Sequence, residues 1–246
     1  MKLSNIVIVL DHPDESRNIG SACRAMANND IKTLRIVGKK EDYNLEQINT
    51  LAIHAAYIFE NAQFYDSILD ATRDCSISAG TTRRMGKKRG KLLLPEEFSE
   101  KAAVITGDKS DAKVAVVFGN ERTGLTDSQL EQCTLGVTIP SSKEFGSLNL
   151  SHAVQILCYH LFRESLKEHN KSVVSYTPLS LERIDSCVQK ITDNMQKLGF
   201  FKMPGREDME NFWRSFLSRA SLTEGEAKYL ETTFSKISGL AGKNQK

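Results

Sequence analysis

Two runs of consecutive apolar residues constrain the fold of this chain most. Residues 5–11 read NIVIVLD, which is rich in Ile and Val, and residues 113–119 read KVAVVFG, which contains three Val. Uninterrupted apolar runs of this length are typical of parallel strands that are buried on both faces. The other expected elements alternate along the chain, with strands at 34–37, 75–80 and 135–140 and helices at 18–29, 66–73, 125–133 and 147–169. This alternation predicts an α/β fold, a mostly parallel sheet with helices on both faces.

The last third of the chain has a different pattern. No strand-like alternation follows residue 168, and three helices are expected at 180–198, 207–219 and 223–237. Trp213 and Phe216 share the apolar face of the second of these helices and are predicted to lie in its core. We therefore expect one α/β domain over residues 1–168, a linker at 169–178, and a small all-α extension over residues 179–246.

Composition and motifs exclude several classes of protein. The 246 residues are 40% hydrophobic and 26% charged, and no apolar run approaches the ~18 residues of a membrane helix. The five scattered cysteines contain no C-x-x-C pair, which indicates reduced thiols and a cytoplasmic protein. The five histidines contain no H-x-x-x-H pair, so no metal site is expected. No strand is followed by G-x-G-x-x-G, and the phosphate-loop and G-x-S-x-G motifs are missing as well.

Three predicted strand-to-helix junctions are unusually polar and rich in glycine. They cover residues 11–24, 118–126 and 139–150. In open α/β sheets, ligands bind at the carboxyl ends of the strands, where these junctions lie. Any one of the three could serve only to cap a helix. Together, on one sheet, they indicate a functional site.

The residues in these junctions resemble the three motifs of the RNA ribose 2′-O-methyltransferases of the SPOUT superfamily, in its TrmH-like group. The motifs are NIGxxxR from Asn18 to Arg24, VVFGNERxGL at 116–125, and IP followed by SLNLSxAV at 139–154. Residues 198–200 and 212–220 are also similar to the helical extension of the TrmJ subgroup. The ordered set of motifs makes this resemblance specific.

The resemblance implies a fold, a cofactor and an assembly. The fold would include a C-terminal trefoil knot, in which the last part of the α/β domain threads through a loop. The cofactor would be S-adenosyl-L-methionine, held largely by main-chain groups, and the protein would be a homodimer with active sites near the subunit interface. The cofactor-binding residues implied are Thr81, Gly119, Asn120, Glu121, Ile139, Ser147 and Leu148.

The resemblance also implies roles for five residues in catalysis. Arg24 is the residue that it marks as catalytic. Because a guanidinium with a pKa above about 12 is a poor base, we expect Arg24 to orient a phosphate and to stabilise negative charge on the ribose oxygen. Ser147 and Asn149 would position the substrate or the motif loops, and Asn18 would fix Arg24. Glu121 is expected to hold its loop by accepting main-chain hydrogen bonds.

Positive charge for RNA binding is concentrated locally, although the whole chain carries only +2. Residues 83–91 contain six basic side chains and no acid, and two arginines of the tail lie in the segment that is similar to the TrmJ extension. Clustered cations are the usual phosphate-binding feature of RNA-binding proteins. Phe200, Phe201 and Trp213 of the tail could add base stacking, with the core as the favoured place for Trp213. The predicted RNA-binding residues are Arg83, Arg84, Lys87, Lys88, Arg89, Arg214 and Arg219.

The sequence therefore predicts an S-adenosylmethionine-dependent enzyme that methylates a ribose 2′-hydroxyl in tRNA, at position 32 of the anticodon loop. The three motifs indicate the reaction but not which RNA nucleotide is methylated, so methylation of ribosomal RNA or of another tRNA position remains an alternative. A catalytically inactive RNA-binding protein with the same fold is a further alternative. Neither a membrane nor a metal is an expected partner.

Overall fold

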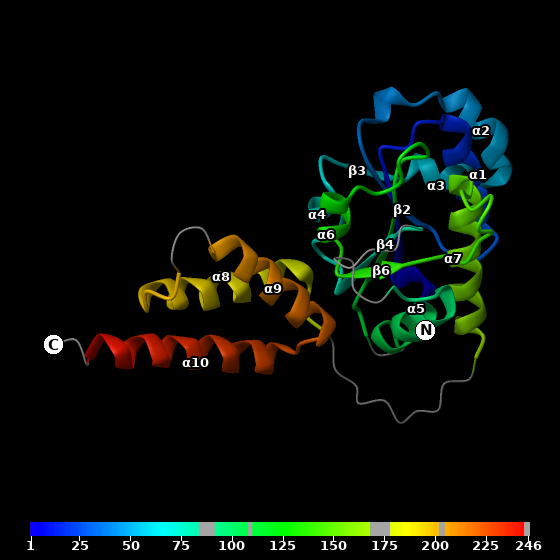
Figure 1. The fold of residues 1–246 in the computed structure, drawn as a ribbon. Coiled ribbons are helices and arrows are strands. Elements are labelled where there is room, and N and C mark those ends of the chain that lie inside the picture. Colours follow the sequence, from blue (N-terminus) through cyan, green and yellow to red (C-terminus); the bar gives the residue numbers. More distant parts are fainter. Residues whose placement is uncertain (84–91, 108–109, 168–177, 202–204, 244–246) are drawn as a thin grey trace. The chain divides into compact units, whose positions relative to one another are not determined.

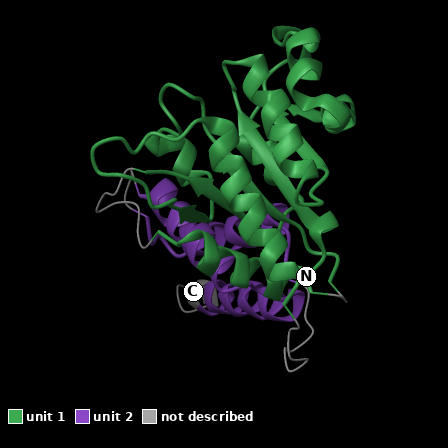
Figure 2. Cartoon of the chain, turned by 90° about the vertical axis from the view of Figure 1, so that its right-hand side faces the viewer, with its two compact units in different colours: residues 1–175 green, residues 176–246 purple. Residues whose placement is uncertain are grey.

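The computed structural model describes residues 1–83, 92–107, 110–167, 178–201 and 205–243 (Figure 1). The chain forms two compact units, Met1–Ser175 and Tyr176–Lys246 (Figure 2). The first unit contains the whole sheet, and the second consists of helices.

A six-stranded sheet forms the centre of the first unit. Its strands are β1 (Ile6–Asp11), β2 (Thr33–Val37), β3 (Gln63–Tyr65), β4 (Ile77–Thr81), β5 (Val114–Phe118) and β6 (Leu135–Val137). The strand order is β3-β2-β1-β5-β4-β6, and every pair is parallel. The two apolar runs of the sequence are β1 and β5, which pair with Ile8 opposite Val116 near the middle of the sheet. The predicted parallel sheet is confirmed.

Helices cover both faces of this sheet. They are α1 (Ser16–Ala27), α2 (Leu45–Ala52), α3 (Ala56–Glu60), α4 (Ile68–Thr72), α5 (Pro95–Ile105), α6 (Asp127–Glu131) and α7 (Leu150–Ser165), with short 3-10 turns η1 (Leu3–Asn5), η2 (Lys40–Asp42) and η3 (Ile53–Ala55). Alternate side chains of β1 point to opposite faces. Ile8 belongs to a core shared with α1, α2, α5 and α7, whereas Val9 belongs to a core shared with α4 and the α6 segment. Burial on both sides is the reason that β1 is apolar from Ile6 to Leu10.

Some elements differ from those expected from the sequence. The strand β3 and the helices α2 and α5 were not predicted, because each is short or has only a weak apolar period. Helix α7 begins at Leu150 rather than at residue 147, because Asn149 caps it. Strand β6 ends at Val137 rather than at Pro140, and the next main-chain amide, that of Thr138, donates to the carbonyl of Leu93 at 2.9 Å. A knot formed by threading the chain through a loop stays a prediction.

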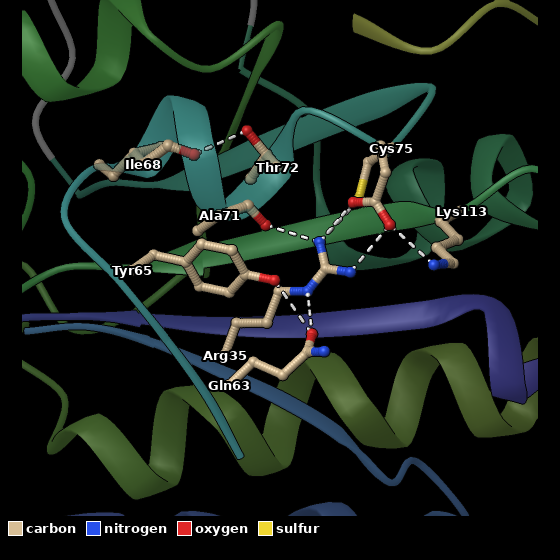
Figure 3. A network of polar contacts seen from close by, with 9 residues as sticks. Arg35, Gln63, Tyr65, Ile68, Ala71, Thr72, Cys75 and Lys113 are labelled. Carbon is tan, nitrogen blue, oxygen red and sulfur yellow. Dashed lines mark hydrogen bonds and ion pairs between the residues drawn. The ribbon is translucent and has the colours of Figure 1, made fainter. Parts of the chain in front are cut away.

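An ion pair between the buried Arg35 and the partly exposed Asp74 crosses the amino-terminal side of the sheet (Figure 3). Arg35, only 4% exposed, donates to Asp74 Oδ1 at 2.5 Å and Oδ2 at 2.9 Å, to the carbonyl of Ala71 at 2.7 Å, and to Gln63 Oε1 at 3.3 Å. Lys113 Nζ contacts Asp74 Oδ2 at 2.7 Å. The hydrogen bond from Arg35 holds the pKa of the Asp74 carboxyl well below its usual range. A cavity of about 510 Å³ borders this network, and none of the described residues predicted for the functional site lines it.

Over residues 178–201 and 205–243, the second unit contains three helices, α8 (Leu181–Lys197), α9 (Arg206–Arg219) and α10 (Glu224–Lys243). The apolar face of α8 supplies most of its core, and Leu217 of α9 and Ala227 of α10 are also buried in it. Arg183 ties α8 to α10, with Nε 3.0 Å and Nη2 2.9 Å from the two oxygens of Glu224. Helix α10 runs six residues further than the end predicted at residue 237.

One core prediction in this unit is wrong. Trp213 packs against the core as a partly buried residue, but Phe216 is 46% exposed. The two positions are three residues apart and therefore about 60° apart around the helix. Because the core covers a narrow strip of α9, only one of the two side chains faces it.

No helix in the described ranges has both the length and the apolar content needed to cross a membrane. Over the same ranges, no group of three or more His, Cys, Asp or Glu side chains is arranged to hold a metal ion.

Candidate active site

The second and third polar junctions line a cavity of about 310 Å³ at the carboxyl ends of the strands, and the first junction is hydrogen-bonded to the second through Glu121. This happens because β1, β5, β4 and β6 are neighbours in the sheet and run in the same direction. All seven residues predicted to bind the cofactor line this cavity, namely Thr81, Gly119, Asn120, Glu121, Ile139, Ser147 and Leu148. Their role in holding a cofactor stays a prediction.

The loop after β5 folds back on itself tightly at the cavity wall. A Cβ on Gly119 would lie 2.3 Å from the carbonyl carbon of Gly124 and 2.3 Å from the amide nitrogen of Leu125, so no side chain fits there. Gly124 has a φ of +64°, which glycine adopts without strain, and its amide donates to the carbonyl of Asn120 at 2.7 Å. The two glycines thus let main-chain atoms approach the cavity.

Glu121 connects the loop after β5 to the loop after β1. Its Oε2 accepts a hydrogen bond from the amide of Asp14 at 2.8 Å, and its Oε1 accepts from the amide of Glu15 at 3.3 Å and from Asn18 Nδ2 at 2.9 Å. Glu121 accepts main-chain hydrogen bonds, as predicted. The donors, however, belong to the loop after β1 and not to the loop that carries Glu121.

Asn149 connects the third junction to the same network. As the residue before α7, it accepts a hydrogen bond from the amide of Ser151 at 2.8 Å, and its Nδ2 donates to Asn18 Oδ1 at 2.9 Å. Glu121, Asn18 and Asn149 therefore form one hydrogen-bonded chain that joins the three junctions, and Asn18 is more than 100 residues from either partner in sequence. The positions of the three loops depend on one another.

Asp11 is a residue of this region that the sequence did not single out. It ends β1, is 3% exposed, and lies with Oδ1 3.0 Å from His12 Nδ1 and with Oδ2 accepting from Gln129 Nε2 at 2.5 Å. His12 has a φ of +44°, and its carbonyl accepts a hydrogen bond from Asn120 Nδ2 at 2.8 Å. Burial raises the pKa of the Asp11 carboxyl. An acid at the end of an apolar strand was the available signal.

Arg24 lies in the last turn of α1, and its side chain is exposed. Within the described residues, the guanidinium of Arg24 makes no hydrogen bond or ion pair, and Arg24 does not line the cavity. Asn18, which was predicted to fix Arg24, makes no hydrogen bond to it among the described residues. The Asn18 side chain is hydrogen-bonded to Glu121 and Asn149 instead. The guanidinium is therefore open to a ligand from solvent.

The predicted RNA-binding residues have different surroundings. Arg83 lines the cavity and donates to the carbonyl of Lys143 at 3.3 Å. In the second unit, Arg214 pairs with Asp185 at 2.5 Å, whereas Arg219 is exposed and donates to Ser215 Oγ at 2.6 Å. Four of the predicted residues, Arg84, Lys87, Lys88 and Arg89, lie outside the described residues.

Residues 5–159, which contain every strand and all three junctions, match the SpoU rRNA Methylase family. The chain belongs to this family. Membership confirms the resemblance to RNA methyltransferases that the three motifs suggested, and it places the chain among the methyltransferase enzymes.

Similar proteins match beyond the limits of the family domain. An uncharacterized tRNA/rRNA methyltransferase of Haemophilus influenzae is 39% identical, over 96% of this chain and 95% of that protein. The tRNA (cytidine/uridine-2′-O-)-methyltransferase TrmJ of Pectobacterium atrosepticum is 31% identical, over 96% of this chain and 97% of that protein. The crystal structure of TrmJ from Z. mobilis shares the fold, with a TM-score of 0.74 at 24% identity over 94% of this chain and 98% of that one.

Proposed function

We propose that this member of the SpoU family transfers a methyl group from S-adenosylmethionine to a ribose 2′-hydroxyl of tRNA. The observation that carries the proposal is the similarity to the Pectobacterium tRNA (cytidine/uridine-2′-O-)-methyltransferase, which spans 96% of this chain and 97% of that enzyme. A match of that extent includes helices α8 to α10, which lie beyond the family domain at residues 5–159. The similarity therefore covers the helical unit as well as the α/β unit.

The cavity has the chemistry that S-adenosylmethionine requires. Its volume of about 310 Å³ lies at the lower end of the range for small-molecule sites. Ile139, Leu148 and Leu150 supply apolar surface for an adenine ring, and the Glu121 carboxylate supplies negative charge for a cationic methionine group. The close approach of Gly119 and Gly124 leaves main-chain groups at the wall, where they can bind hydroxyl and amino groups.

The cofactor, when bound, supplies a methyl group already activated by positive sulfur. The protein must align the ribose oxygen with that methyl group and assist the loss of the oxygen's proton. Arg24, whose guanidinium has no partner among the described residues, binds the RNA phosphate next to the reacting ribose and stabilises negative charge on the ribose 2′-oxygen. The chain of Glu121, Asn18 and Asn149 holds the loop that begins α1 in a fixed position beside the cavity.

Substrate binding and assembly complete the proposal. Arg83 at the cavity and the basic residues that follow it bind the tRNA backbone, and position 32 of the anticodon loop is the target favoured by the TrmJ-like helical unit. The protein acts in the cytoplasm, where tRNA is modified. It works as a homodimer, and exposed apolar side chains of the first unit, among them Ile53, Tyr57 and Leu166, support burial in an interface. Sedimentation at micromolar concentration tests the dimer.

Methyl transfer in vitro tests the function directly. Purified protein is incubated with S-adenosylmethionine and unmodified tRNA or ribosomal RNA, and ribose methyl groups are mapped by mass spectrometry. We expect a methyl group at position 32 of tRNA, and loss of about 10²–10³-fold in kcat for Arg24→Ala with unchanged cofactor affinity. Methylation of ribosomal RNA alone would establish the alternative target, which the family description favours. Cofactor-independent RNA binding without transfer would establish an inactive binding protein.

A further inference from the structure

Helix α9 exposes two aromatic rings side by side. Phe212 is 55% exposed and Phe216 46% exposed, and their rings are 7° from parallel with centroids 6.1 Å apart. Ser215 and Arg219 share this face of the helix, since they follow Phe212 by three and seven residues. The exposed face thus combines two flat apolar rings, a hydroxyl group and a guanidinium.

The two rings are supported from behind by other aromatic side chains. Trp213 lies edge-to-face against both of them, with its ring centroid 5.6 Å from that of Phe212 and 6.0 Å from that of Phe216. Phe234 of α10 packs on Trp213 with a centroid distance of 5.8 Å. The indole Nε1 of Trp213 is buried and has no hydrogen-bond acceptor among the described residues. Backing of this kind fixes the rings and prevents them from turning inward to the core.

The charge on this face narrows the choice of ligand. Arg214, on the other side of α9, is neutralised by Asp185 at 2.5 Å, whereas Arg219 contacts only the Ser215 hydroxyl among the described residues. An uncompensated guanidinium one turn beyond a pair of exposed rings suits a ligand that alternates flat bases with phosphates. Unpaired nucleotides of RNA have this chemistry, because their bases stack on aromatic rings and their phosphates bind arginine.

We propose that Phe212 and Phe216 form a stacking surface for unpaired bases of the tRNA substrate, with Arg219 binding an adjacent phosphate. This inference rests on the proposed function and names a second RNA-binding element for it. The surface belongs to the helical unit, whereas the candidate active site belongs to the α/β unit. Its loss therefore raises the Kd and KM for tRNA and leaves the kcat and the affinity for S-adenosylmethionine unchanged.

Trp213 provides a direct reading of this surface, because it is the only tryptophan in the chain and contacts both rings. The full-length protein is titrated with tRNA, with a single-stranded oligoribonucleotide and with a blunt RNA duplex, while tryptophan emission is recorded. We expect tRNA and the single strand to change the emission, and the duplex to leave it unchanged.

Variants then separate stacking from charge. Phe212→Ala with Phe216→Ala is expected to raise the Kd for tRNA about tenfold without changing its salt dependence, because stacking releases no counterions. Arg219→Gln is expected to reduce the slope of log Kd against log salt by about 0.7–1. Phe212→Leu with Phe216→Leu keeps the apolar area and should also lose affinity. Tyr229→Ala removes a 76% exposed aromatic ring from α10 and serves as the unchanged control.

The outcomes of these experiments distinguish a failure of the proposed stacking surface from a failure of the proposed tRNA methyltransferase function. Wild-type protein that methylates tRNA, together with a double variant that binds tRNA as tightly as wild type, overturns the inference alone. A double variant with unchanged tRNA affinity but altered sedimentation would identify a protein–protein contact instead, and would also overturn it. Wild-type protein that neither binds nor methylates tRNA removes the proposed function and this inference together.

Discussion

Replacement of Glu121 by Gln tests whether the three loops of the candidate site depend on one another. The change keeps the size of the side chain but converts one accepting oxygen into a donor. The amides of Asp14 and Glu15 and the Nδ2 of Asn18 all donate to the two oxygens of Glu121. A glutamine in either orientation therefore points an N–H group at another N–H group.

The expected magnitude follows from these three bonds. A hydrogen bond to a charged group contributes about 1.5–3 kcal/mol, and the partial exposure of this network brings each bond toward or below the lower limit. Glu121→Gln loses one hydrogen bond and turns the others from charged to neutral bonds. Together these changes destabilise the ordered arrangement of the loops by about 2 kcal/mol. A population shift of that size corresponds to about 30-fold. We expect the Kd for S-adenosylmethionine and kcat/KM to worsen by between about fivefold and 30-fold.

Isothermal titration with S-adenosylmethionine and steady-state methylation of tRNA measure the two quantities. Glu131→Gln makes the same chemical change at an exposed position of α6 and serves as the control. Adding Asn18→Asp to Glu121→Gln supplies a new acceptor for the glutamine amide while keeping one for Asn149, so the pair should recover much of the loss. A change of less than twofold in both quantities for Glu121→Gln would refute the reasoning.

Three further predictions concern the stability of the fold and the reactivity of its buried thiols. Arg35→Gln should lower the free energy of unfolding at pH 7 by about 1–2 kcal/mol, as measured by urea denaturation. The change removes the hydrogen bonds of Arg35 to the buried Ala71 carbonyl and to Asp74, a partly exposed carboxylate that keeps Lys113 as a partner. Arg35 lowers the pKa of Asp74 in the folded protein, so the ion pair stabilises the fold above the unfolded pKa of about 4, and this stabilisation is lost as the pH falls. The difference in the free energy of unfolding between variant and wild type should therefore become smaller in acid. Asp11→Asn should lower stability by about 1–2 kcal/mol in thermal and urea melts, and adding Gln129→Glu should restore it by reversing donor and acceptor. The four buried cysteines should resist iodoacetamide at pH 8 until the protein is unfolded, as counted by mass spectrometry; burial raises the pKa of the Cys75 thiol, for example, to about 12.

The fold class was available from the sequence because it depends on patterns that are local. Uninterrupted apolar runs identified β1 and β5, and helical spacing identified α1 and α8. Elements with weak local signals were missed, such as the three-residue β3 and the helix α5, whose apolar period is poor. The exposure of Phe216 was also beyond reach, because a helical pattern shows which residues share a face but not how much of that face the core covers.

The candidate site divides in the same way. The motifs located Glu121, Asn18 and Asn149 by residue type and order, and the sequence alone placed each in a strand-to-helix junction. That Glu121 binds the amides of a loop 106 residues away, or that Asn18 faces Asn149 rather than Arg24, was decided by the order β1-β5-β4-β6 and by the lengths of the loops. Asp11 and Gln129 likewise became partners only through packing. The sequence by itself determined which chemical groups are present and on which elements they lie. The tertiary structure decided which of them meet, because hydrogen bonds depend on distances of about 3 Å that no linear spacing encodes.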